Sequence, residues 1–133
     1  MPERDLARIL ATLSVQVRPG RYAFAWCTEP NPRLAAQAEA CVREDGGIAY
    51  VLREEHVPPD VEVDAFRAAW LTLDVHSALE AVGLTAAVST ALADAGIACN
   101  VIAGARHDHL LVDAARCEDA LDALAALQRR HAT

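Results

Sequence analysis

Residues 74–85, DVHSALEAVGLT, contain the residue types of a small-ligand site. Ser77 and Glu80 have the spacing of a capping box, which predicts a helix that begins at the serine. Gly83 breaks this helix after one turn, and a longer helix is predicted directly after it. The amides of residues 83–85 are therefore candidates to bind a carboxylate, because unpaired amides at a helix start attract anions and glycine permits close backbone approach.

A carboxylate ligand that is also an amino acid brings an ammonium group, which needs an oxygen partner. Asp74, at the end of a predicted strand, and Asn100, in a later strand, are the candidates for that role. The alternative is a capped helix with a glycine kink and no ligand, because capping boxes are common in helices of every function.

The segment His107-Asp108-His109 raises the question of a metal ion. Alternate residues of a strand share a face, so the two imidazoles are able to reach one ion, with His76 or Cys99 as a third ligand. The pair lies at a predicted hairpin, however, where polar side chains are normally solvated. Metal binding is therefore the lower-ranked alternative.

No catalytic constellation emerges from the sequence. Ser77 follows His76 directly, and neighbours at a helix start do not face each other as members of a triad must. The chain has neither G-x-S-x-G nor a Walker motif. We expect neither enzymatic activity nor a cofactor.

Composition excludes two classes of function. The net charge is −7 and no basic run is present, so the electrostatic signature of a nucleic-acid-binding protein is missing. No apolar run approaches the roughly 20 residues that span a bilayer, and MPERDLARIL does not read as a signal peptide. The four cysteines lie far apart, which favours free thiols and a cytoplasmic location.

Hydrophobic periodicity predicts the elements of a mixed α+β fold. The first part should contain a helix over 4–13, a turn at Pro19-Gly20, a strand over 22–27, a helix over 34–42 ended by Gly46-Gly47, a strand over 48–54 and a connector over 56–64. The second part should contain a strand over 69–75, a helix over 84–95, strands over 98–104 and 109–113, and a helix over 117–127.

The second part is a ferredoxin-like unit without its last strand, whereas the first part begins with an extra helix. We therefore expect two halves, 1–64 and 65–133, that share elements within one compact body.

The stretch 70–112, WLTLDVHSALEAVGLTAAVSTALADAGIACNVIAGARHDHLLV, resembles an ACT domain, a small regulatory module attached to enzymes of amino-acid metabolism. It has a strand ending in a short loop, a glycine before the helix, and Ala-Gly-Ile leading into the second strand. The chain is more closely similar to small stand-alone bacterial proteins with two ACT-like halves. In those proteins aromatic residues usually precede the His-Asp-His segment, whereas here Ala105-Arg106 stand in that place.

The resemblance implies tandem ACT-like, ferredoxin-like βαββαβ units with antiparallel sheets and helices on one face. It also implies a ligand site at an interface, between the loop after the first strand and the following helix. The candidate ligand-binding residues are Asp74, Val75, His76, Ser77, Gly83, Leu84, Thr85, Asn100 and Val101.

These expectations favour a non-catalytic regulatory protein that binds a small molecule, with an amino acid as the favoured ligand, and forms a homodimer. The alternative is a structural or protein-interaction module with no ligand. A metal-binding protein that uses His107 and His109 ranks below both.

Overall fold

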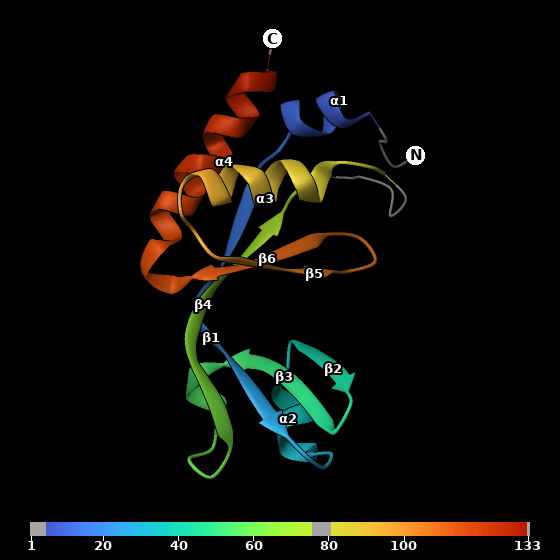
Figure 1. Ribbon diagram of the computed structural model, residues 1–133, viewed down its shortest axis with the longest axis vertical. Helices are drawn as coiled ribbons and strands as arrows, with labels where there is room; N and C mark the ends of the chain where they lie inside the picture. The colour runs from blue at the N-terminus through green and yellow to red at the C-terminus, as the bar shows by residue number, and fades with distance from the viewer. Residues whose placement is uncertain (1–4, 76–80, 133) are drawn as a thin grey trace. The chain divides into compact units, whose positions relative to one another are not determined.

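The computed structural model describes residues 5–75 and 81–132. Its helices are α1 (Leu6–Ala11), α2 (Pro32–Gln37), α3 (Leu84–Asp94) and α4 (Cys117–His131), with short 3-10 turns η1 (Glu54–His56) and η2 (Ala114–Arg116). Its strands are β1 (Val15–Cys27), β2 (Ala40–Glu44), β3 (Gly47–Arg53), β4 (Glu62–Leu73), β5 (Cys99–Ala103) and β6 (Asp108–Asp113). Their hydrogen-bonding order is β2-β3-β1-β4-β6-β5 (Figure 1).

The chain divides into two compact units, which we call the terminal unit (Met1–Arg18 with Ala69–Thr133) and the central unit (Pro19–Ala68). The long strands β1 and β4 each contribute residues to both units. In the terminal unit, β4, α3, β5, β6 and α4 follow in sequence, and residues 15–18 of β1 supply the strand that this series lacks. The predicted ferredoxin-like α+β class with shared elements is confirmed.

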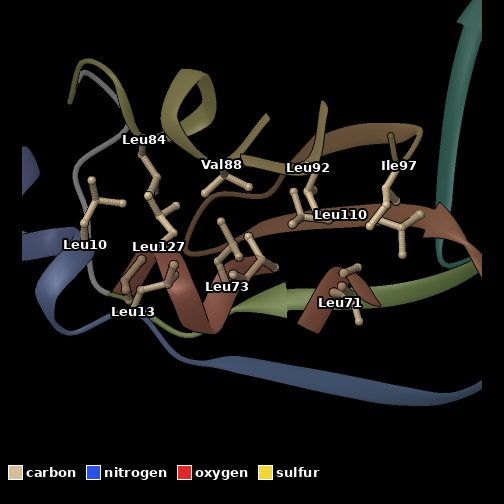
Figure 2. Close-up of a cluster of buried hydrophobic side chains, with 14 of the residues drawn as sticks. Leu10, Leu13, Leu71, Leu73, Leu84, Val88, Leu92, Ile97, Leu110 and Leu127 are labelled. Carbon is tan, nitrogen blue, oxygen red and sulfur yellow. The ribbon is translucent and has the colours of Figure 1, made fainter. Parts of the chain in front are cut away.

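One hydrophobic cluster holds the terminal unit together (Figure 2). Leu84, Val88 and Leu92 recur every four residues, so α3 buries one face, and Gly96 follows its end with a φ of +72°. Strands β4 and β6 and helices α1 and α4 bury the residues that complete the cluster, among them Leu10, Leu71, Leu73, Leu110, Val112, Leu124 and Leu127. Figure 1 shows α1, α3 and α4 on one side of β5 and β6, as the sequence predicts.

The central unit has a smaller core of Ala25, Leu34, Tyr50 and Leu52. The side chain of Asn31 accepts from the amides of residues 33 and 34 and so caps α2. Its own backbone amide donates to the Tyr50 hydroxyl at 3.1 Å, which gives this buried phenol a partner.

The predicted helix over 34–42 is wrong in its second half. Helix α2 ends at Gln37, and residues 40–44 instead form β2, which pairs with β3 from Ala40 opposite Val51 to Glu44 opposite Gly47. Asp45-Gly46 is the two-residue turn of this hairpin, with Gly46 at a φ of +85°. Asp-Gly is a preferred sequence for such turns because its residues tolerate positive φ.

The turn predicted at Pro19-Gly20 is also wrong, because β1 runs without interruption from Val15 to Cys27. Gly20 has a φ of +94°, so the glycine changes the backbone direction within the strand and does not end it. The predicted connector over 56–64 is correct only in part, since β4 already begins at Glu62.

The ends of the other predicted elements lie within one or two residues of those observed, with three exceptions: β1 and β4 begin seven residues earlier than the predicted strands, and α4 ends four residues later than the predicted helix. The capping-box helix predicted at Ser77 lies outside the described residues. The division into halves at 1–64 and 65–133 stays a prediction about two ACT-like copies. By packing, residues 5–18 belong with the second of them. No helix in the described ranges is long and apolar enough to cross a membrane.

Candidate functional site

A cavity of about 580 Å³ lies in the terminal unit where β4 ends. Asp74 and Val75 line it from the end of this strand, and Arg106 and His107 line it from the connection between β5 and β6. Residues 76–105 separate the two segments in the chain. They meet because β6 is the neighbour of β4 in the sheet.

Asp74 is held by its backbone and keeps its carboxylate accessible. Its amide donates to the Ser14 carbonyl at 2.8 Å, which continues the pairing of β4 with the start of β1. Its Oδ2 accepts from Gln16 Nε2 at 3.3 Å, and the residue is exposed. Val75 next to it is buried in the core of the unit. The cavity is therefore lined by Val75, which is fixed in the core, and by Asp74, which is exposed and carries a negative charge.

The connection over residues 104–107 is a tight turn. The Gly104 amide donates to the His107 carbonyl at 2.9 Å, next to the Ala103–Asp108 pair that ends the β5–β6 ladder. Arg106 and His107 are exposed at its tip. This turn contributes two basic residues, Arg106 and His107, to the lining of the cavity that Asp74 also lines.

His109 adds side-chain hydrogen bonds between this hairpin and β4, which is the neighbour of β6 in the sheet. Its Nδ1 lies 2.9 Å from Thr72 Oγ1, and Trp70 Nε1 donates to it at 3.3 Å. Trp70 Nε1 also approaches Thr72 Oγ1 at 3.2 Å. The Arg18 guanidinium lies over the Trp70 ring, 4.4 Å from its centroid, in cation–π geometry.

Burial lowers the pKa of His109 below its ordinary value, and the nearby Arg18 and His107 lower it further. Asp108 opposes this shift. The neutral imidazole is the form favoured by this environment, because a positive charge is penalised both by desolvation and by neighbouring cations.

The residues predicted around the start of α3 are only partly described. Gly83 is the N-cap of α3 with a φ of +104°, and its carbonyl accepts from the Ala87 amide at 2.9 Å. Leu84 is buried in the core, whereas Thr85 is exposed. His76 and Ser77 lie outside the described residues.

Asn100 and Val101 lie on β5, paired with Leu111 and Leu110. Both are exposed on this strand, and neither is among the described residues that line the cavity. The structure thus brings Asp74 and Val75 together with the turn over residues 104–107 and not with Asn100 and Val101.

Among residues 5–75 and 81–132, no three or more His, Cys, Asp and Glu side chains form a group that fits a metal ion. The His107 and His109 rings have centroids 6.5 Å apart. Cys99, suggested as a third ligand, begins β5 and so lies at the other end of this strand from the turn. Burial raises the pKa of its thiol, which disfavours the thiolate that binds metals.

Arg106 is the lining residue that sequence reasoning did not select as a ligand partner. The signal for it lies in topology, because the third strand of a βαββ unit pairs with the first. The hairpin before β6 must therefore lie beside the end of β4, and a basic residue there faces the same region as Asp74.

A family model described as the ACT domain matches residues 66–126. A protein from Vibrio cholerae, described as of unknown function and a possible transport protein, is 36% identical over 92% of this chain and 95% of its own. The chain belongs to the ACT domain family. The Vibrio structure superposes on this ACT protein with a TM-score of 0.82.

Two further solved structures extend the similarity. A protein from Agrobacterium tumefaciens is 25% identical, covering 87% of this chain and 89% of its own, with a TM-score of 0.72. The ligand-free regulatory subunit of aspartate kinase from Thermus thermophilus is 12% identical, covering 85% and 95%, with a TM-score of 0.63, and so shows the ACT fold alone. Comparison with curated proteins gives no match.

Proposed function

We propose that this ACT protein binds a free amino acid in the Asp74–Arg106 cavity and acts as a regulatory module without catalysis of its own. One observation carries the proposal: an aspartate and an arginine, Asp74 and Arg106, line the same cavity. An amino acid presents the complementary pair, with its ammonium group for Asp74 and its carboxylate for Arg106. Arginine suits the second role because its planar fork binds a carboxylate with two hydrogen bonds.

The size and chemistry of the cavity support a small polar ligand. Its volume of about 580 Å³ is within the range of small-molecule sites. Val75 supplies an apolar surface, and His107 supplies a further hydrogen-bonding group. The amides of residues 83–85 stay proposed as additional carboxylate ligands, and the positive φ of Gly83 at the start of α3 supports this role.

Membership of the ACT family favours a regulatory role over an enzymatic one. The ligand would stabilise one state of the protein, and a partner would recognise that state. The four cysteines are free, which supports a reducing compartment such as the cytoplasm.

A thermal-shift screen of the twenty L-amino acids against the wild-type protein tests the proposal. A ligand at about a hundred times its Kd adds about 2.7 kcal/mol of stability, so one amino acid or one chemical group of them should raise the Tm. Arg106→Gln and Asp74→Asn should each abolish the shift. Arg43→Gln is the matched control, because it removes an exposed arginine from β2 in the central unit. No shift with any amino acid at millimolar concentration would contradict amino-acid binding.

A homodimer is proposed on separate grounds. Strand β5 stands last in the strand order, and Val101 on it is 36% exposed. Exposed strand edges are normally covered, and a second copy is a simple cover. Sedimentation velocity of the wild type and of Val101→Lys tests this, since a lysine on the edge should shift a dimer toward monomers. A stable dimer together with no ligand would instead favour the protein-interaction module.

A further inference from the structure

We infer that His109 is a positioning residue for the Asp74–Arg106 cavity: its imidazole fixes the turn over residues 104–107 against β4. The inference rests on the proposed function, because it concerns how the ligand cavity keeps its shape. His109 does not line the cavity itself, and it would act through Arg106 and His107.

The two walls of the cavity come from the ends of different strands. Asp74 and Val75 directly follow β4, and His107 directly precedes β6. The hydrogen bonds of His109 to Trp70 and Thr72 join these two strands within a few residues of both walls. A shift of the start of β6 relative to β4 would therefore change the separation between the charged groups of the cavity.

The donors around His109 favour one tautomer. The indole N–H of Trp70 is a donor only, and it is shared between Thr72 Oγ1 at 3.2 Å and His109 Nδ1 at 3.3 Å. A lone pair on Nδ1, with the ring proton on Nε2, is the arrangement that accepts from it. The Thr72 hydroxyl, 2.9 Å away, is able to donate to the same nitrogen. Trp70 is 2% exposed, which makes an acceptor for its N–H important.

The opposite side of the ring faces the turn. A Cβ at Gly104 would lie 3.2 Å from His109 Nε2 and 2.9 Å from the His107 carbonyl. The glycine thus lets the turn pack closely on the imidazole. His109 contacts β4 through one nitrogen and lies close to the turn through the other.

The charged and titratable groups around His109 maintain the acceptor form. Arg18 of β1 and His107 of the turn disfavour a second proton on the ring, and Asp108 on β6 favours it weakly. The partners from β4, Trp70 and Thr72, are uncharged.

The test compares His109→Phe with His109→Asn in the full-length, ¹⁵N-labelled protein. Phenylalanine keeps the ring but removes the acceptor, whereas the asparagine Oδ1 replaces Nδ1 as an acceptor. His109→Phe should shift the indole N–H resonance of Trp70 and the amide resonances of residues 104–107, and His109→Asn should restore them. His56→Phe, an exposed histidine of the central unit, is the matched control and should leave these resonances unchanged.

The same variants are then titrated with the L-amino acid that gives the largest thermal shift with the wild type. His109→Phe should weaken the affinity by about tenfold, as expected when a hydrogen bond to a charged group is misplaced, and His109→Asn should recover most of it. If the wild type and His109→Phe bind equally, or if residues 104–107 keep their resonances, the positioning role is refuted and the proposed function stands. If the wild type binds no amino acid, the proposed function fails and the positioning role with it.

Discussion

The indole Nε1 of Trp70 lies 3.3 Å from Nδ1 of His109, and this contact links β4 to β6. The two rings have centroids 5.3 Å apart at an interplanar angle of 51°. Trp70 is almost fully buried, and the imidazole shares with Thr72 the role of accepting from an N–H that is withdrawn from water. His109, which lies next to the turn that lines the cavity, therefore also contributes a side-chain contact between two strands of the sheet.

The first prediction concerns pH. The pKa of His109 is lowered in the folded protein, so the unfolded chain takes up a proton at higher pH than the folded protein does. The stabilising contribution of neutral His109 is therefore complete above its unfolded pKa, about 6.5, and is lost as pH falls from there through the lower folded pKa. The stability advantage of the wild type over His109→Phe should shrink from pH 7.5 to pH 5.

Urea denaturation of both proteins at several pH values measures this difference. His56→Phe serves as the control, because it removes an exposed histidine of the central unit. A wild-type advantage that stays constant across the range would contradict the depressed pKa of His109.

The second prediction concerns the cysteines. Burial raises the pKa of Cys99, and burial together with Glu118 raises that of Cys117. Cys41 is exposed on β2. Iodoacetamide at pH 8, followed by mass spectrometry, should therefore label Cys41 first and Cys99 and Cys117 slowly, because the thiolate is the reactive species. Equal rates at Cys41 and Cys99 would refute this order.

The third prediction concerns the hairpin of the central unit. A Cβ at Gly47 would lie 2.5 Å from both the Cys27 carbonyl and the Trp26 ring, so Gly47→Ala must displace β3 from β1. We expect a loss of about 1–3 kcal/mol of stability and a shifted indole resonance of Trp26. Gly46→Ala is the neighbouring control, because its Cβ would meet nothing within 4 Å. It should cost about 1–2 kcal/mol, from its positive φ alone, and leave that resonance in place. An unchanged Trp26 resonance in Gly47→Ala would contradict the packing.

The fourth prediction concerns the core of the terminal unit. Leu92 is fully buried between α3 and the sheet, so Leu92→Ala should cost about 2–5 kcal/mol in urea denaturation. Leu121→Ala, at a half-buried position of α4, should cost less. Equal losses would show that the cluster does not depend on Leu92.

Sequence reasoning succeeded where one periodicity governs a whole element. The apolar positions of α3 fit a single helical face from Leu84 to Leu92, and Gly96 marks its end. The missing last strand was inferred from element order alone. That β1 supplies it from the opposite end of the chain follows from the packing of residues 15–18 with the terminal unit.

The errors arose where a local sequence pattern fits more than one structure. Cys41 and Val42 continue the helical spacing of α2, yet they lie on β2, where hairpin pairing with β3 overrides helix propensity. Pro19-Gly20 has the composition of a turn, but the glycine only redirects a strand that passes from one unit to the other.

The site was partly predictable for the same reason. Asp74 lies at the end of β4, as predicted, because the alternation of apolar residues along a strand indicates where the strand ends. Arg106 lines the cavity because β6 is the neighbour of β4 in the sheet. Strand order brings together residues that are far apart in sequence, so no local sequence pattern indicates this contact.

The most direct test of the amino-acid site is an NMR titration of the ¹⁵N-labelled wild type with each amino acid that raises its Tm. The account predicts saturable shifts concentrated at the amides of Asp74, Val75 and residues 104–107, with Arg106→Gln abolishing them. Saturable shifts confined to the central unit, or no saturable shift with any of the twenty amino acids, would contradict it.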